Sequence, residues 1–262
     1  MSIIHVEYLS SILKRQVSFK AIIPLEKPGA DLSVKREMRT LYLLHGYMGH
    51  CTDWLSGSLI GELADRHDIA VIMPSGENSF YIDNAEEETY FGEYIGKEII
   101  DFTRAMFPLS HKREDTMIGG LSMGGFGAVR NGLKYCDVFG SVIALSSALI
   151  TDQISDPSVD FSKTPASRKY YEKTFGKLDE LLGSENDPKA LAKKVLEEGR
   201  PFPDIYMACG TEDFLLKENR DFKEYLQTLG VRFTYRETAG AHDWKFWNPQ
   251  IEYALDWVDK II

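Results

Sequence analysis

The chain has 262 residues, of which 44% are hydrophobic and 27% are charged, a globular composition that excludes disordered, collagen-like and coiled-coil proteins. This length suits one α/β domain with a sizeable core, so we expect residues 1–262 to form a single domain. Thirty Lys and Arg against forty Asp and Glu give a formal charge of −10, which excludes generic attraction to nucleic acid or to anionic membranes.

The amino-terminal sequence does not resemble a signal peptide, because His5 and Glu7 interrupt its apolar residues. The longest apolar runs are far shorter than the roughly 20 residues that span a bilayer. Three scattered cysteines, Cys51, Cys136 and Cys209, form no CxxC pair and indicate no disulfide framework. These features predict a cytoplasmic protein.

The first third of the chain is predicted to be rich in strands. Apolar and polar residues alternate over Ile3–Leu9 and Gln16–Ile23, as in half-buried antiparallel strands, and Pro24 ends the second. The polar stretch Glu26–Arg39, with Pro28 and Gly29, predicts a loop.

Continuous apolar runs alternate with helical patterns in the next part of the chain. Runs at Leu41–Leu44, Ile69–Met73, Met117–Ile118 and Val142–Leu145 are typical of parallel strands buried on both faces. Between them, apolar residues spaced as in a helix run from Tyr94 to Met106. This alternation predicts an α/β fold with a mostly parallel sheet.

Residues 151–200 differ from the rest, being charged, containing three prolines and showing helical spacing only in short pieces. Strand character resumes at Ile205–Ala208 and Val231–Tyr235, with a predicted helix between them that includes Phe214 and Leu229. The amphipathic segment Trp244–Ile262 predicts a final helix. We interpret 151–200 as an insertion between two strands of one sheet.

The sequence Gly120-Leu121-Ser122-Met123-Gly124 matches the GxSxG pattern. It follows the predicted strand Thr116–Ile118 and precedes a predicted helix over Gly125–Tyr135, which is where a nucleophile elbow forms. The serine hydroxyl then lies at a helix amino terminus, where free amides and the helix dipole favour negative charge. We predict Ser122 as a nucleophile.

A serine nucleophile needs a base, and of six histidines only His242 follows Ser122 in the chain. In hydrolases with this elbow the order is Ser, then Asp or Glu, then His. The acid is predicted to be Asp213, after the penultimate strand, with the neighbouring Glu212 as the alternative.

An oxyanion hole requires backbone N–H groups directed at the developing charge. We expect one from Met123, the residue after the nucleophile, and one from Tyr47 in the glycine-containing loop after the third strand. His45, Phe80 and Trp244 are candidates for the substrate pocket, although each also suits a structural position in a loop or helix. No spacing of His, Cys or acidic residues suggests a metal site, and no nucleotide-binding motif is present.

Five segments resemble the esterase D-like α/β-hydrolases: LYLLHGYMG, VIMPSGENSFY, GGLSMGGFGA, CGTEDF and AGAHDWKFW. This family includes S-formylglutathione hydrolases, tributyrin esterases, feruloyl and acetyl-xylan esterases, and bacterial mycolyltransferases. The resemblance implies an α/β-hydrolase fold with a sheet of about eight strands and a helical cap at 151–200. It also implies a catalytic triad of Ser122, Asp213 and His242, with the amides of Tyr47 and Met123 forming the oxyanion hole.

The residues around His242 resemble the tributyrin, feruloyl and acetyl esterase branch. The resemblance therefore implies a serine carboxylesterase without cofactor or metal, acting on short acyl esters such as acetyl, butyryl or feruloyl esters, including those of oligosaccharides. An acyltransferase, an S-formylglutathione hydrolase-type thioesterase and, less favoured, a non-catalytic binding module remain alternatives. The sequence leaves formation of a homo-oligomer open.

Overall fold

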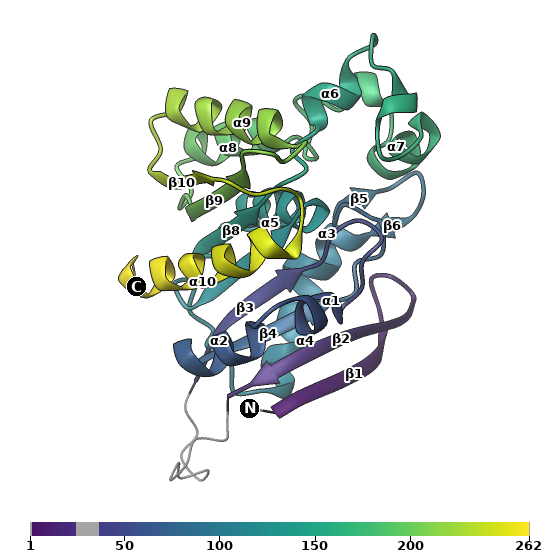
Figure 1. Cartoon of the computed structure of the whole chain (residues 1–262). Helices are drawn as coiled ribbons and strands as arrows, with labels where there is room; N and C mark the ends of the chain where they lie inside the picture. The colour runs from purple at the N-terminus through teal and green to yellow at the C-terminus, as the bar shows by residue number, and fades with distance from the viewer. Residues whose placement is uncertain (1, 25–36, 262) are drawn as a thin grey trace, which may run out of the picture.

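The structure, a computed structural model describing residues 2–24 and 37–261, is built on one eight-stranded sheet (Figure 1). The strand order is β1-β2-β4-β3-β7-β8-β9-β10. The strands are β1 (Ser2–Ser10), β2 (Arg15–Ile23), β3 (Arg39–Leu44), β4 (Ile69–Pro74), β7 (Thr116–Leu121), β8 (Ser141–Leu145), β9 (Asp204–Gly210) and β10 (Phe233–Thr238). From β4 to β10 all neighbours in this sheet are parallel, whereas β1 and β2 are antiparallel, so the expected fold class is confirmed.

Successive side chains of a strand point to opposite faces of the sheet, which explains why the sheet has an apolar core on each face. On β3, Leu41 and Leu43 join one apolar cluster, whereas Tyr42 and Leu44 join the other. Because both sets are buried, β3 appears in the sequence as a continuous apolar run.

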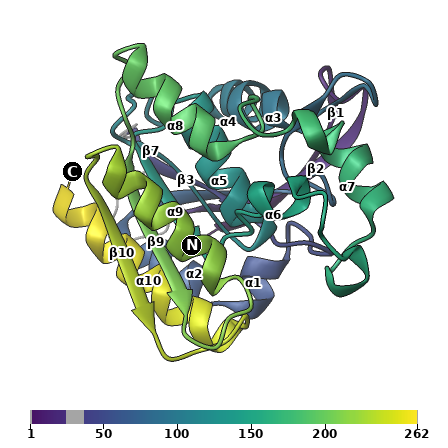
Figure 2. The ribbon, with the colours of Figure 1, turned by 90° about the horizontal axis from the view of Figure 1, so that it is seen from above.

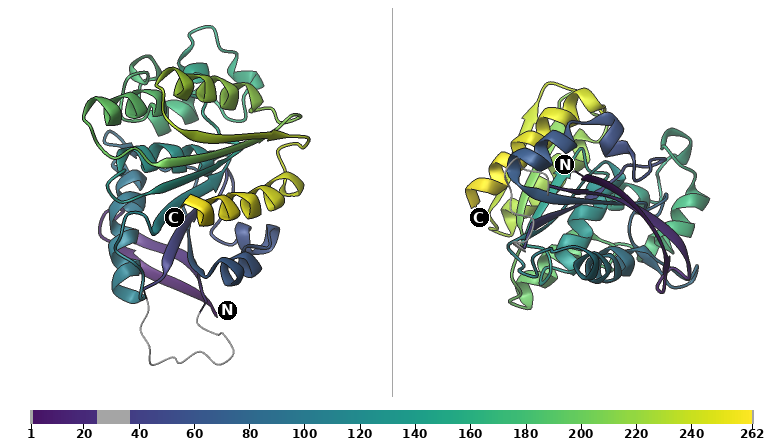
Figure 3. Two further views of the ribbon diagram at one scale, coloured as in Figure 1. Left: turned by 90° about the vertical axis from the view of Figure 1, so that its left-hand side faces the viewer. Right: turned by 90° about the horizontal axis from the view of Figure 1, so that it is seen from below.

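Helices cover both faces of the sheet (Figure 3). One face carries α1 (Asp53–Gly57), α2 (Ile60–His67) and α10 (Trp244–Ile261). The other carries α3 (Phe91–Glu93), a π-helical turn (Tyr94–Glu98), α4 (Ile99–Met106), α5 (Met123–Lys134), α8 (Pro188–Glu197) and α9 (Leu216–Thr228). Figure 2 shows β9 and β10 side by side near the end of the chain.

Several boundaries differ from the sequence predictions. The helix predicted to include Phe214 begins only at Leu216, because Asp213 and Phe214 belong to the turn that follows β9. A two-stranded sheet of β5 (Asp83–Asn84) and β6 (Thr89–Tyr90) was not predicted. Most of the loop predicted over Glu26–Arg39 lies outside the described residues, and Arg39 already belongs to β3.

The segment between β8 and β9 forms short helices, of which α6 and α7 project together at the top of Figure 1. They are α6 (Thr151–Ser155), a 3-10 turn (Phe161–Lys163), α7 (Arg168–Phe175), a 3-10 turn (Leu178–Glu180) and α8. Local signals begin two of them: Ser167 caps α7 by accepting from the Tyr170 amide, and Asp187 caps α8 ahead of Pro188. The last of these helices, α8, packs against α5.

Candidate active site

The predicted site residues all follow parallel strands whose carboxyl ends share one edge of the sheet. Tyr47 follows β3, Ser122 follows β7, Asp213 follows β9 and His242 follows β10. In open α/β sheets, loops at this edge form the binding crevice. Residues far apart in the sequence are thereby brought together.

Ser122 lies at a sharp turn between β7 and α5 with φ of 55°, a strained conformation for a residue other than glycine. Small neighbours allow this turn. A Cβ at Gly124 would lie 2.5 Å from the Leu44 carbonyl oxygen, and a Cβ at Gly120 would lie 2.4 Å from the Gly124 backbone. The Ser122 amide donates to Leu145 (2.9 Å), and its carbonyl accepts from Ala148 (3.0 Å). The strand–turn–helix context predicted for the GxSxG sequence is therefore present.

His242 is hydrogen-bonded to Asp213, with Nδ1 2.9 Å from Oδ2 and 3.1 Å from Oδ1. Since an ionised carboxylate can only accept, Nδ1 carries the proton and Nε2 is left as the basic nitrogen. The Asp213 side chain is inaccessible to solvent. Burial raises the pKa of Asp213, but hydrogen bonds from His242, the Leu215 amide and Ser146 outweigh it and hold this pKa below its usual range.

The acidic residues adjacent in sequence to this pair, Glu212 and Asp243, have other hydrogen-bond partners. Glu212 is exposed and accepts from the Gly240 amide and the Thr211 hydroxyl, which supports the loop before His242. Asp243 accepts from the Lys245 and Phe246 amides at the start of α10. The geometry thus favours Asp213 over the alternative Glu212 as the partner of His242.

Ser146 and Trp247 lie next to the Asp213–His242 pair. The Trp247 indole N–H donates to Ser146 Oγ (3.0 Å), and the Ser146 side chain is one of the groups that lower the pKa of Asp213. The Trp247 ring also meets the His242 ring edge-on, with centroids 4.9 Å apart. Ser146 is fully buried with φ of 46°, so a second strained serine lies one strand away from the first.

We expect Trp247→Phe to lower kcat about fivefold with little change in KM. The substitution keeps an aromatic ring on His242 but removes the donor to Ser146, at a cost of about 1 kcal/mol for one neutral hydrogen bond. Steady-state hydrolysis of a chromogenic ester measures both constants. Trp257→Phe is the matched control, because Trp257 lies on the same helix and contacts Tyr206 instead. Equal kcat losses in both variants would contradict this role.

The amides of Met123 and Tyr47 are the donors that the sequence predicts for an oxyanion hole. Met123 is the first residue of α5, where backbone N–H groups have no partner within the helix. In the loop after β3, the Met48 amide donates to Asn78 Oδ1 (2.7 Å) and the Gly49 amide donates to the Gly46 carbonyl (3.1 Å). Among the bonds recorded for the described residues, none uses the Tyr47 amide.

A cavity of about 360 Å³ lies above this edge of the sheet. Tyr47, Ser122, Met123 and His242 line it together with Phe80. Its remaining wall is mostly apolar and comes largely from the segment after β8, including Ile150, Pro165, Ala166, Tyr170 and Tyr171. The Tyr170 hydroxyl donates to the Asn78 carbonyl (2.6 Å), which anchors α7 beside the Tyr47 loop.

Two of the three predicted pocket residues have structural positions instead. His45 is buried; its Nε2 accepts from the Gly76 amide (2.9 Å) and its Nδ1 donates to the Gly46 carbonyl (2.8 Å), tying two loops together. Burial lowers the pKa of His45, in keeping with a neutral ring. Trp244 packs edge-on against Trp54, with centroids 5.2 Å apart. Neither is among the residues that line the cavity, so the prediction fails for His45 and Trp244.

Phe214 was not identified as a site residue from the sequence. Its ring centroid lies 4.6 Å from that of His242, it lines the cavity, and it is 63% exposed. The signal that the sequence contained was an aromatic residue directly after the predicted acid.

The described part of the chain contains no group of three or more His, Cys, Asp or Glu residues that could hold a metal ion. Within residues 2–24 and 37–261, no helix is both long enough and apolar enough to cross a membrane.

Comparison with known proteins identifies the family. Residues 10–258 match the family model described as "Putative esterase". The chain belongs to this esterase family. It is a serine carboxylesterase with the α/β-hydrolase fold, and the family resemblance predicted from the motifs is confirmed.

Relatives of this esterase match along its whole length. An acetyl esterase of Caldicellulosiruptor saccharolyticus is 48% identical, with 100% of this chain and 99% of that protein covered. The substrate-bound structure of fluorophosphonate-binding serine hydrolase F of Staphylococcus aureus is 30% identical, with a TM-score of 0.87 and 98% of both chains covered. An S-formylglutathione hydrolase of the same organism is 31% identical, with a TM-score of 0.84 and 98% of both chains covered.

Proposed function

We propose that this esterase hydrolyses short-chain acyl esters with Ser122, Asp213 and His242 as its catalytic triad. One observation carries the proposal: Ser122 and His242 line the same cavity, and His242 is bonded through Nδ1 to the buried Asp213. This arrangement leaves a basic nitrogen in the residue that shares this cavity with a serine at a strained turn.

In the proposed mechanism, His242 Nε2 takes the proton of the Ser122 hydroxyl as its oxygen attacks the ester carbonyl carbon. The amides of Tyr47 and Met123 stabilise the oxyanion. His242 then protonates the departing alcohol, leaving an acyl-serine. Water, deprotonated by His242, attacks this intermediate and releases the acid. Asp213 stays ionised throughout and stabilises the imidazolium.

The substrate class follows from the cavity and the relatives. A mostly apolar cavity of about 360 Å³ has room for a small acyl group, and a 48% identical relative is an acetyl esterase. We therefore propose acetyl and butyryl esters, including those of acetylated oligosaccharides, as substrates, with feruloylated oligosaccharides as the alternative. Pro165 and Tyr170 belong to the proposed cap within 151–200 and would limit acyl length.

The proposal is tested by hydrolysis of p-nitrophenyl esters from acetate to decanoate, combined with labelling by a fluorophosphonate. We expect kcat/KM to be highest for acetate and butyrate, and peptide mapping to find the label on Ser122. Turnover that persists after complete labelling, or a label on another serine, would contradict the triad. Folded protein without turnover on any ester would favour the binding-module alternative.

A thioesterase is the second candidate, because a 31% identical neighbour is described as an S-formylglutathione hydrolase. A higher kcat/KM for S-formylglutathione than for p-nitrophenyl acetate would favour it. Adding acceptor alcohols and analysing the products separates a hydrolase from an acyltransferase. A cytoplasmic location remains a prediction from the sequence.

A further inference from the structure

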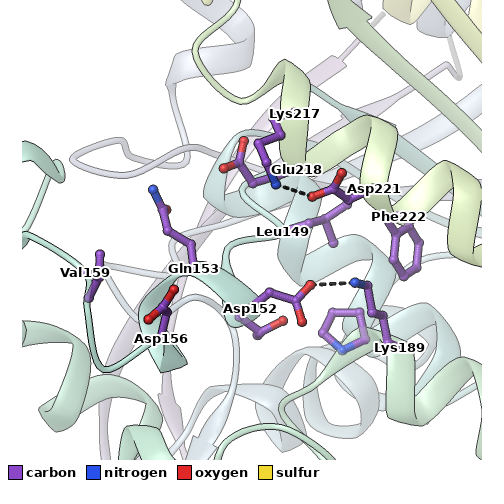
Figure 4. Close-up of a pocket in the computed structure, with 12 residues that line it drawn as sticks. Leu149, Asp152, Gln153, Asp156, Val159, Lys189, Lys217, Glu218, Asp221 and Phe222 are labelled. Atoms are coloured by element: carbon purple, nitrogen blue, oxygen red, sulfur yellow. Dashed lines mark hydrogen bonds and ion pairs between the residues drawn. The ribbon is translucent and has the colours of Figure 1, made fainter.

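A second cavity of about 360 Å³, shown in Figure 4, shares lining residues with the active-site cavity. Its walls come from α6, the start of α8 and the first turns of α9. Gln153 of α6 and Glu218 of α9 line both cavities and so form their common wall. The two cavities therefore adjoin at these two side chains.

The lining of the second cavity has an excess of negative charge. Its two lysines are already paired, with Lys189 Nζ 2.5 Å from Asp152 and Lys217 Nζ 2.6 Å from Asp221, as the dashed lines in Figure 4 show. The other two carboxylates, those of Asp156 and Glu218, have no ion-pair partner within the described residues. The cavity thus presents two carboxylates, which can accept hydrogen bonds and are not neutralised by a lysine or arginine within the described residues.

Of the carboxylates that line the second cavity, Glu218 also lines the active-site cavity. Its Oε2 is shut off from solvent and has no hydrogen-bond partner among the described residues. Burial also raises the pKa of Glu218. A hydroxyl or ammonium group entering between the cavities would supply the missing donor, whereas an anion would be repelled.

We propose that the second cavity is a subsite for the alcohol part of the ester, selecting neutral or cationic groups rich in hydrogen-bond donors and rejecting anionic ones. The subsite rests on the proposed function, because it requires ester hydrolysis at Ser122. The acyl group then occupies the apolar cavity, and the polyol or amino alcohol faces Gln153 and Glu218.

The test compares four acetate esters that differ only in the alcohol: glycerol 1-monoacetate, 2-(dimethylamino)ethyl acetate, butyl acetate and acetoxyacetate. The first offers hydroxyl donors, the second an ammonium N–H, the third no donor and the fourth a carboxylate. We expect kcat/KM for at least one donor-bearing ester to exceed that for butyl acetate about tenfold, the effect of one charge-assisted hydrogen bond. Acetoxyacetate should be the poorest substrate.

Substitutions at Glu218 and Gln153 test whether these two residues cause the preference among the four esters. Glu218→Gln removes the charge with little change in shape, so the ratio of kcat/KM for acetoxyacetate to that for butyl acetate should rise about tenfold. Gln153→Ala should lower the advantage of the donor-bearing esters. Glu224→Gln is the matched control, because it removes the same charge from an exposed position on the same helix and should leave all ratios unchanged.

Two outcomes would overturn the subsite. One is a wild-type enzyme that hydrolyses all four esters with similar kcat/KM, and the other is a preference that Glu218→Gln and Gln153→Ala both leave unaltered. Turnover of p-nitrophenyl acetate separates this failure from failure of the proposed function. An enzyme inactive on that ester as well lacks the proposed activity, whereas one that is active without alcohol preference lacks only the subsite.

Discussion

Ser122→Ala is expected to lower kcat for p-nitrophenyl acetate about 10⁶-fold, because the acyl intermediate can no longer form. The residual rate would come from water attack assisted by His242 and the amides of Tyr47 and Met123. Release of p-nitrophenolate under single-turnover conditions measures this rate against the uncatalysed reaction.

Ser122→Gly provides the control for folding. With φ of 55° at this position, Gly is less strained than Ala. We therefore expect both variants to be inactive, with Ser122→Gly more stable than Ser122→Ala by about 1 kcal/mol in urea unfolding. An Ala variant that unfolds at the wild-type urea concentration and still turns over the ester would rule out Ser122 as the nucleophile.

Asp213→Asn is expected to lower kcat about 10⁴-fold while KM changes little. The amide can donate to His242 Nδ1, which stabilises the tautomer with its proton on Nε2 and removes the base. Glu212→Gln is the matched control, and because Glu212 contacts the Gly240 loop instead, kcat should stay within about twofold of wild type. The reverse result, a large loss in Glu212→Gln alone, would make Glu212 the acid.

The effect of Asp213→Asn on the free energy of unfolding should depend on pH. The pKa of Asp213 is lowered in the folded state, so its ionisation stabilises the fold above the ordinary carboxyl range, and this contribution is lost as pH falls through the lowered pKa. The stability difference between wild type and Asp213→Asn should therefore shrink between neutral and strongly acidic pH. Urea unfolding at several pH values measures it, and a difference independent of pH would contradict the lowered pKa.

The sequence was most informative where local pattern and position in the sheet coincide. Ser122 and His242 could be proposed because Ser122 directly follows a strand and His242 lies in the loop after another, and parallel strands bring such residues to one edge of the sheet. The inner strands β3, β4, β7 and β8 were predictable because they form continuous apolar runs between helical patterns.

Contacts that depend on tertiary packing could not be predicted in this way. Ser146 follows the strand predicted over Val142–Leu145, and only the approach of α10 gives it Trp247 as a donor. His45 and Trp244 lie close in sequence to site residues, but their side chains point into loop and helix packing. Closeness in sequence to a site residue therefore does not predict whether a side chain points into the cavity.

The contacts of Asn78 restrict how this enzyme can be recombined with its relatives. Its carbonyl accepts from Tyr170 on α7, and its side chain accepts from Met48 beside the Tyr47 amide. A chimera that exchanges α7 to accept another acyl group would remove the donor to Asn78 unless the incoming helix also carries a tyrosine at position 170. Grafts at this segment should therefore exchange 75–81 and α7 as one unit.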